Sequence, residues 1–113
     1  MHLTTERSDG VVIVRVGETR LIYPLLSAFA ETVAALIKNG EHKILIDVSQ
    51  VVYLDSSSIG CLMDLYRQSA TSGGTLKLSG VHKRVRTMLT MTGAQEFIEI
   101  HGDEQSALDT FGV

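Results

Sequence analysis

Residues 43–60 read KILIDVSQVVYLDSSSIG, and this stretch decides the fold because a strand pattern gives way to a helix pattern within it. The run KILIDV at 43–48 is short, apolar and rich in β-branched residues, which is typical of a buried strand. An acid and three serines, Asp55 to Ser58, then stand where a helical spacing of apolar residues begins. The stretch therefore predicts a strand–loop–helix unit with hydroxyls at the N-terminus of the helix.

The sequence upstream of this unit predicts a hairpin and a first helix. The run VVIVRV at 11–16 is nearly continuous in apolar residues, so it indicates a strand buried on both faces. A polar run at 2–7 and a turn at 8–10 precede it, which predicts an N-terminal β-hairpin. A helix is expected to begin near Pro24 and to end at Asn39-Gly40, since proline suits a first turn and Asn-Gly suits a left-handed stop.

Downstream, strands and helices continue to alternate. We expect a helix whose apolar face carries Ile59, Leu62, Met63, Tyr66 and Ala70, then a strand at 75–80 and a third helix closed by Gly93. A last strand at 97–101 and a short final helix complete the order β-β-α-β-α-β-α-β-α. This order predicts an α/β fold, a single domain over residues 1–113, with a mostly parallel central sheet of four to five strands and helices packed on it.

Composition narrows the classes of function. The chain has 113 residues, a formal charge of −3 and few aromatic residues, which gives no case for nucleic-acid binding. No apolar run reaches the ~20 residues of a membrane span, so no direct membrane insertion is expected. Cys61 is the single cysteine and the N-terminal residues do not resemble a signal peptide, so we expect a cytoplasmic location.

The serines at the helix mouth have two chemical interpretations. A serine or aspartate oxygen accepts from the first helical amides, which have no internal partner, and capping alone needs one such residue. The same free amides and the helix dipole also favour an anion. A phosphoryl group on one of these serines adds about −1.5 to −2 charge. It would eject a protein docked over the helix end, so the domain would act as a two-state binding module.

Catalysis is the weaker alternative. A nucleophilic serine needs a base and a group that orients this base, and the segment does not match G-x-S-x-G. The four histidines are scattered, without metal-ligand spacing to any cysteine or acid. We therefore expect no enzyme activity, no metal and no cofactor.

The sequence resembles the STAS domain family, and within it the bacterial anti-sigma factor antagonists. Residues 47–60, DVSQVVYLDSSSIG, are similar to the family's D-x-S-x-V-x-x-x-D-S-S-G-L-G. The Gly73-Gly74-x-Leu76 element also fits. The tract VRTMLTMTG at 85–93 resembles the family's V-x-x-x-L-x-x-x-G. The resemblance covers nearly the whole chain and implies the STAS fold.

The resemblance also implies a function and a site. The first serine of the pair is the family's phosphoacceptor, which implies Ser56, with Ser57 and Ser58 as alternatives. The implied partners are an anti-sigma factor serine/threonine kinase and a PP2C-type phosphatase. The unmodified protein sequesters the kinase, which is released after it phosphorylates the serine with ATP. The phosphatase then removes the phosphate. Sequestering the kinase frees a sigma factor. The residues expected to contact a partner are Asp55, Ser56, Ser57, Ser58, Ile59, Asp64, Arg67 and Arg20.

Two positions depart from the family pattern. Ser58 replaces a glycine, which offers a competing hydroxyl or alters access for a kinase. Arg20 stands where the family carries an acid, and it would either weaken recognition by the usual kinase or pair with a phosphate on Ser56. These departures leave a second interpretation open, in which the domain is a constitutive adaptor of a stress-signalling or membrane-transport complex and is never phosphorylated.

Overall fold

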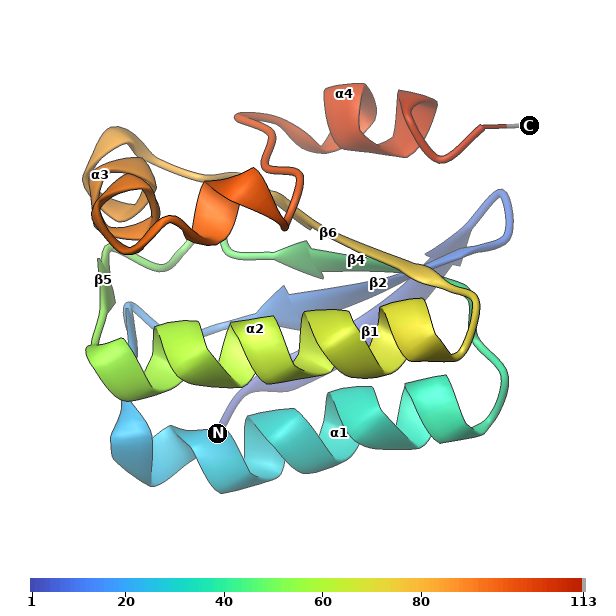
Figure 1. Ribbon diagram of the computed structural model, residues 1–113, viewed down its shortest axis with the longest axis horizontal. Helices are drawn as coiled ribbons and strands as arrows, with labels where there is room; N and C mark the ends of the chain where they lie inside the picture. Colours follow the sequence, from blue (N-terminus) through green and yellow to red (C-terminus); the bar gives the residue numbers. More distant parts are fainter. Residues whose placement is uncertain (113) are drawn as a thin grey trace.

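A four-stranded sheet in the order β1-β2-β4-β6 forms the centre of the computed structural model, which describes residues 1–112 (Figure 1). β1 runs antiparallel to β2, while β2, β4 and β6 are parallel neighbours. The predicted hairpin and the mostly parallel α/β sheet are thereby confirmed. The elements are β1 (Leu3–Ser8), β2 (Val11–Val16), β3 (Arg20–Leu21), η1 (Tyr23–Leu25), α1 (Leu26–Lys38), β4 (Lys43–Asp47), β5 (Tyr53–Leu54), α2 (Ser56–Thr71), β6 (Thr75–Ser79), α3 (Lys83–Thr92), η2 (Ala94–Glu96) and α4 (Glu104–Asp109).

The two long helices α1 and α2 lie side by side on one face of the sheet, and α4 lies on the other (Figure 1). Phe29 of α1 and Leu62 of α2 are fully buried with the inward side chains of the strands in the main core. On the opposite face Ala107 of α4 packs on Val11 and Ile13 of β2 and on Leu45 of β4. Strand β2 is therefore covered on both faces, which explains its nearly continuous apolar sequence.

The buried stripe of α2 differs from the expected one. Ile59 and Leu62 are buried as predicted, whereas Ala70 is exposed and Leu65 and Ser69 are buried in its place. The difference arises because α2 packs against both the sheet and α1, so the centre of its buried face is set by two neighbours.

The expected strand at 97–101 is reduced to a single parallel bridge between Leu78 and Ile100. Gly93 ends α3 in the left-handed region, with φ of +80°, and the turn η2 follows it directly. Ile98 then points inward while Phe97 stays exposed. The chain runs beside β6 only from Glu99 to His101, where the Leu78 amide donates to the Glu99 carbonyl at 3.0 Å and the His101 amide donates to the Leu78 carbonyl at 2.9 Å, so the main sheet has four strands.

Two strands that the sequence did not predict, β3 and β5, form a separate parallel pair at the end of the molecule where α2 begins (Figure 1). The loop before β5 is fixed by a close approach. Gly80 follows β6 with φ of +71°, and a Cβ at this position would lie 2.6 Å from the Cβ of Ser49. Only glycine combines this positive φ with such a contact.

Helix α4 is held to the sheet by two cations, the half-buried Arg15 and the buried Lys77. The Arg15 guanidinium lies 2.8 Å from Asp47, 2.6 Å from Glu104 and 2.9 Å from Glu6. Lys77, whose side chain is almost fully buried, donates to the Thr110 hydroxyl at 2.7 Å and lies 2.9 Å from Glu99. Each cation links the sheet to the C-terminal segment, because each lies on a strand of the sheet and contacts a residue beyond β6.

Within residues 1–112, none of the helices combines the length and the apolar character that crossing a bilayer would require.

The Glu99 contacts predict a loss of stability in acid. Hydrogen bonds from His101 and Lys77 lower the pKa of Glu99 to about 2, from an ordinary value of 4.5. A carboxyl with a depressed folded pKa contributes stability that is complete above 4.5 and is lost as the pH falls through about 2. We expect the urea midpoint to fall over this window, and to fall less in Glu99→Gln, which is already less stable at pH 7.

Glu96→Gln is the matched control, because Glu96 is exposed and makes no ion pair within residues 1–112. Urea titrations followed by circular dichroism at several pH values measure all three proteins. If the urea midpoint of Glu99→Gln falls with pH as steeply as that of the unsubstituted protein, Glu99 is not the source of the acid-dependent stability.

Candidate functional site

The carboxylate of Asp55 organises the beginning of α2. Asp55 is the N-cap residue, and its Oδ1 accepts from the Ser58 amide at 2.8 Å. Its Oδ2 accepts from the Tyr23 amide at 2.9 Å, in the turn η1 that leads into α1. Burial raises the pKa of this carboxyl, but the two amide donors outweigh burial and hold the pKa below its ordinary value. One side chain thus fixes the start of α2 against the start of α1.

The three serines point in different directions. Ser56 and Ser57 occupy the first positions of α2 and are exposed. Ser58 is fully buried, and its hydroxyl donates to the Asp55 carbonyl at 2.7 Å. Ile59 packs in the core. Two hydroxyls are therefore open to solvent, whereas Ser58 would need the helix end to open before it could react.

The first turn of α2 also presents free amides. Its first helical hydrogen bond runs from the Ile59 amide to the Asp55 carbonyl at 3.2 Å. The amides of Ser56 and Ser57 precede this bond, so they have no acceptor in the helix. These donors and the positive end of the dipole lie next to the two exposed hydroxyls, which favours negative charge on either serine.

The short β3–β5 pair brings Arg20 to this site. Arg20 stands opposite Tyr53, and the buried Leu21 stands opposite the buried Leu54. The guanidinium carbon of Arg20 lies 5.3 Å from the centroid of the Tyr53 ring. Residues far apart in the sequence are thus joined beside Asp55.

Exposed apolar side chains lie close to this pair in the chain. Tyr23 is 72% exposed, Val52 44% and Tyr53 36%, and the Val52 amide donates to the Thr19 carbonyl at 2.8 Å. We call Arg20, Tyr23, Val52 and Tyr53 the α2 rim. The two tyrosines and Val52 could not be predicted from the sequence as site residues, because strands of two residues and the short segments beside them carry no periodicity.

Asp64 and Arg67 lie further along α2. Both are exposed, and they form an ion pair of 2.9 Å across one helical turn. Asp64 borders an open hollow of about 400 Å³ between α1 and α2, which begins at Tyr23 and Ser57. The structure therefore connects Asp64 to the serine end of α2 through a continuous surface.

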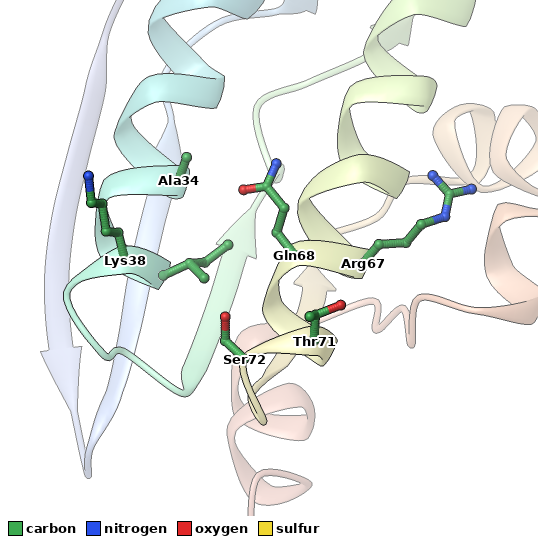
Figure 2. A pocket seen from close by; sticks show the side chains of 7 residues that line it. Ala34, Lys38, Arg67, Gln68, Thr71 and Ser72 are labelled. Carbon is green, nitrogen blue, oxygen red and sulfur yellow. The ribbon is translucent and has the colours of Figure 1, made fainter.

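A second hollow, of about 530 Å³, extends the same seam toward the C-terminal ends of both helices. Figure 2 shows Gln68 reaching from α2 toward α1 and Arg67 extending away from α1. Gln68 borders both hollows, so the two are neighbours along the seam. Cys61 lines the first hollow, and burial raises the pKa of its thiol, with the charge of Asp64 adding to the rise. The thiol is therefore not activated by the helix N-terminus.

The exposed hydroxyls of Ser56 and Ser57 have no side chain beside them, among residues 1–112, that could act as a general base. The rings of His82 and His101 hydrogen bond to the Ser49 carbonyl and to Glu99, and the ring of His2 lies 3.6 Å from Glu18. Within residues 1–112, no imidazole hydrogen bonds to Ser56 or Ser57. The Asp55 carboxylate is occupied by two amides. The arrangement suits a serine that is modified by another protein, because activation of its hydroxyl needs a group from outside.

Fold and site together define a class: an α/β domain in which a capped helix presents two exposed serines beside an apolar, cationic rim. The family model of the STAS domain matches residues 2–107. The chain therefore belongs to the STAS domain family, which confirms the resemblance of its sequence.

Several similar proteins are described as anti-sigma factor antagonists. A candidate anti-sigma factor antagonist of Thermotoga neapolitana is 27% identical over 73 residues, or 65% of each chain, so the match spans less than two thirds of that relative. The crystal structure of a candidate anti-sigma factor antagonist from Thermotoga maritima has a TM-score of 0.86 at 23% identity and covers 96% of this chain and 92% of that one. The Bacillus cell fate determinant SpoIIAA in its phosphorylated form has a TM-score of 0.74 at 17% identity and covers 98% and 100%. Both structures share the fold.

The N-cap geometry predicts the cost of removing Asp55. Asp55→Ala should lower the free energy of unfolding by about 1–2 kcal/mol, because the Ser58 and Tyr23 amides both lose their acceptor. Asp55→Asn keeps one acceptor oxygen and should lose less. Chemical denaturation measures both variants, and equal stabilities of Asp55→Ala and the unsubstituted protein would show that the carboxylate does not hold the helix start.

Proposed function

We propose that this chain is an anti-sigma factor antagonist whose binding is switched by phosphorylation of Ser56. The observation that carries the proposal is the exposed Ser56 hydroxyl at the first position of α2, directly after the capping carboxylate of Asp55. The phosphorylated form in which SpoIIAA has been solved supports the assignment. Ser57 is the alternative acceptor, and the buried Ser58 is the least accessible.

The unmodified protein binds an anti-sigma factor serine/threonine kinase and so frees a sigma factor. The partner contacts the exposed side chains at the mouth and along the side of α2, namely Ser56, Ser57, Asp64, Arg67 and the α2 rim. Asp55 and Ile59 contribute by holding the helix end in place, since one caps it and the other packs beneath it. The rim offers tyrosine and arginine, the residue types that are enriched in protein interfaces.

Phosphorylation releases the kinase. The kinase transfers the γ-phosphoryl group of ATP to the Ser56 oxygen; the hydroxyl proton leaves to a base of the kinase, and ADP is the product. The phosphoserine adds about −1.5 to −2 charge, which the free amides and dipole of α2 stabilise within the domain. A partner seated over the α2 rim loses its fit, since a bulky anion now occupies the interface. A PP2C-type phosphatase restores the serine by hydrolysis.

In this role the domain, over residues 1–113, is a binding module of the cytoplasm and does not itself catalyse a reaction. The kinase and the phosphatase provide all the chemistry. The alternative role of a constitutive adaptor differs in one respect, because an adaptor binds its partner without ever receiving phosphate.

Phosphosite mapping tests the switch. The purified protein is incubated with ATP and each anti-sigma kinase encoded in the same genome, and intact mass and fragment spectra are recorded. We expect one added phosphate, present in Ser57→Ala and absent in Ser56→Ala. Ser56→Asp should lose kinase binding, and Ser56→Ala should bind but not be released by ATP. Phosphate on Ser57 would move the site, and no phosphate with any kinase would reject the switch.

Charge reversal tests the side of α2. Asp64 is exposed, so Asp64→Lys should leave the thermal midpoint nearly unchanged while weakening kinase binding about tenfold, or ~1.4 kcal/mol. Glu31→Lys is the matched control, because Glu31 is an exposed helical acid of α1 that borders neither hollow. Isothermal titration calorimetry measures both. Equal affinities of Asp64→Lys and the unsubstituted protein would remove Asp64 from the interface.

A further inference from the structure

Arg20 is held by an aromatic ring and not by a carboxylate. Arg7, Arg15 and Arg67 pair with carboxylates of their own chain. Arg20 makes no ion pair within residues 1–112, and its guanidinium is instead stacked over the Tyr53 ring at 5.3 Å. Arg84 and Arg86 of α3 also make no ion pair within residues 1–112, but neither stacks on an aromatic ring there. The ring fixes the plane of the guanidinium without neutralising it, so the charge remains available to another molecule.

The acids closest to Arg20 in the sequence or at the site are already engaged. Glu18 accepts from the backbone amide of His2 at 2.8 Å and lies 3.6 Å from its ring. Both oxygens of Asp55 accept backbone amides, from Ser58 and Tyr23. Turning either carboxylate toward Arg20 would leave those amides without their acceptor, which is costly. The domain therefore leaves the charge of Arg20 uncompensated.

The backbone beneath Arg20 is fixed. The next residue, Leu21, is fully buried and pairs in parallel register with the buried Leu54. Tyr23 and Val52, which lie close to Leu21 and Tyr53 in the chain, are exposed as well. An exposed arginine held on a tyrosine ring, with a second exposed tyrosine and a valine nearby in the chain, has the composition of an interface hot spot.

We propose that Arg20, oriented by Tyr53, is the residue that selects the partner, by forming a two-pronged hydrogen-bonded ion pair with a carboxylate on the partner's surface. The planar guanidinium matches a carboxylate with two parallel N–H donors, which a lysine ammonium does not. Partners with a cation at this position are rejected by like charge. The inference rests on the proposed function for the existence of a partner, and adds the chemical group that the partner must present.

The test uses the anti-sigma factors of the same genome and measures the affinity of the unmodified protein for them by calorimetry. Arg20→Ala should bind at least about thirtyfold more weakly, Arg20→Glu more weakly still, and Arg20→Lys in between. Tyr53→Ala should weaken binding and remove the advantage of arginine over lysine at position 20. Arg7→Ala is the matched control and should bind normally, because the exposed Arg7 lies beside the β1–β2 turn and pairs with Glu41 after the end of α1, whereas the α2 rim lies where α1 begins. Thermal midpoints confirm folding.

A charge-swap experiment identifies the partner's carboxylate. Each exposed acid of the partner is changed to arginine, and one of these variants should restore binding to Arg20→Glu while weakening binding to the unsubstituted protein. Equal affinities across the Arg20 series, or the absence of any restoring variant, would overturn the inference. An Arg20→Ala protein that binds normally but loses phosphate from Ser56 faster would also overturn it, since Arg20 would then hold the phosphoserine.

The two proposals fail separately. If Ser56 receives phosphate and the Arg20 series binds with unchanged affinity, only the selection by Arg20 is overturned. If Ser56 is never phosphorylated but the charge swap restores binding, the switch is rejected and the selection by Arg20 is supported. If none of the anti-sigma factors binds the protein, both are overturned.

Discussion

The bridge made by the Asp55 carboxylate is the interaction on which the site depends. One oxygen caps α2 at Ser58, and the other holds the turn before α1 at Tyr23. The two long helices thus begin at one fixed point, above a sheet whose parallel strands end at the same side (Figure 1). The outward direction of Ser56 and Ser57 and the placement of Tyr23 in the rim both follow from this bridge.

The same constraint bears on the proposed switch. Capping satisfies the Ser58 amide, while the amides of Ser56 and Ser57 stay free to stabilise an anion. In the proposed switch, the domain would therefore stabilise a phosphoserine at a point where a docked partner would not tolerate it. Arg20 belongs to a neighbouring but separate part of the surface, since Tyr53 and the β3–β5 pair hold it.

The sequence predicted the parts of the fold that repeat a pattern. Continuous apolar runs revealed β2 and β4, and the acid before the serines revealed the start of α2. The β3–β5 pair could not be found, because two residues carry no periodicity and their register depends on a contact between distant loops. The strand expected at 97–101 failed because Gly93 and η2 bend the chain away from the sheet edge. Ser56 is exposed and Ser58 is buried because of their positions around the helix axis. The sequence alone did not fix the first residue of α2 to better than one position, so it could not tell these two serines apart.

The thin covering on the second face of the sheet has a consequence for solubility. Helix α4 is six residues long, and it contributes Ala107 as its fully buried side chain over Val11, Ile13 and Leu45. Detachment of α4 would uncover a row of aliphatic side chains on adjacent strands while the main core between sheet and helices stays intact. Such a row is a template for self-association. Damage to the C-terminal segment would therefore lead to aggregation of molecules whose main core is still folded.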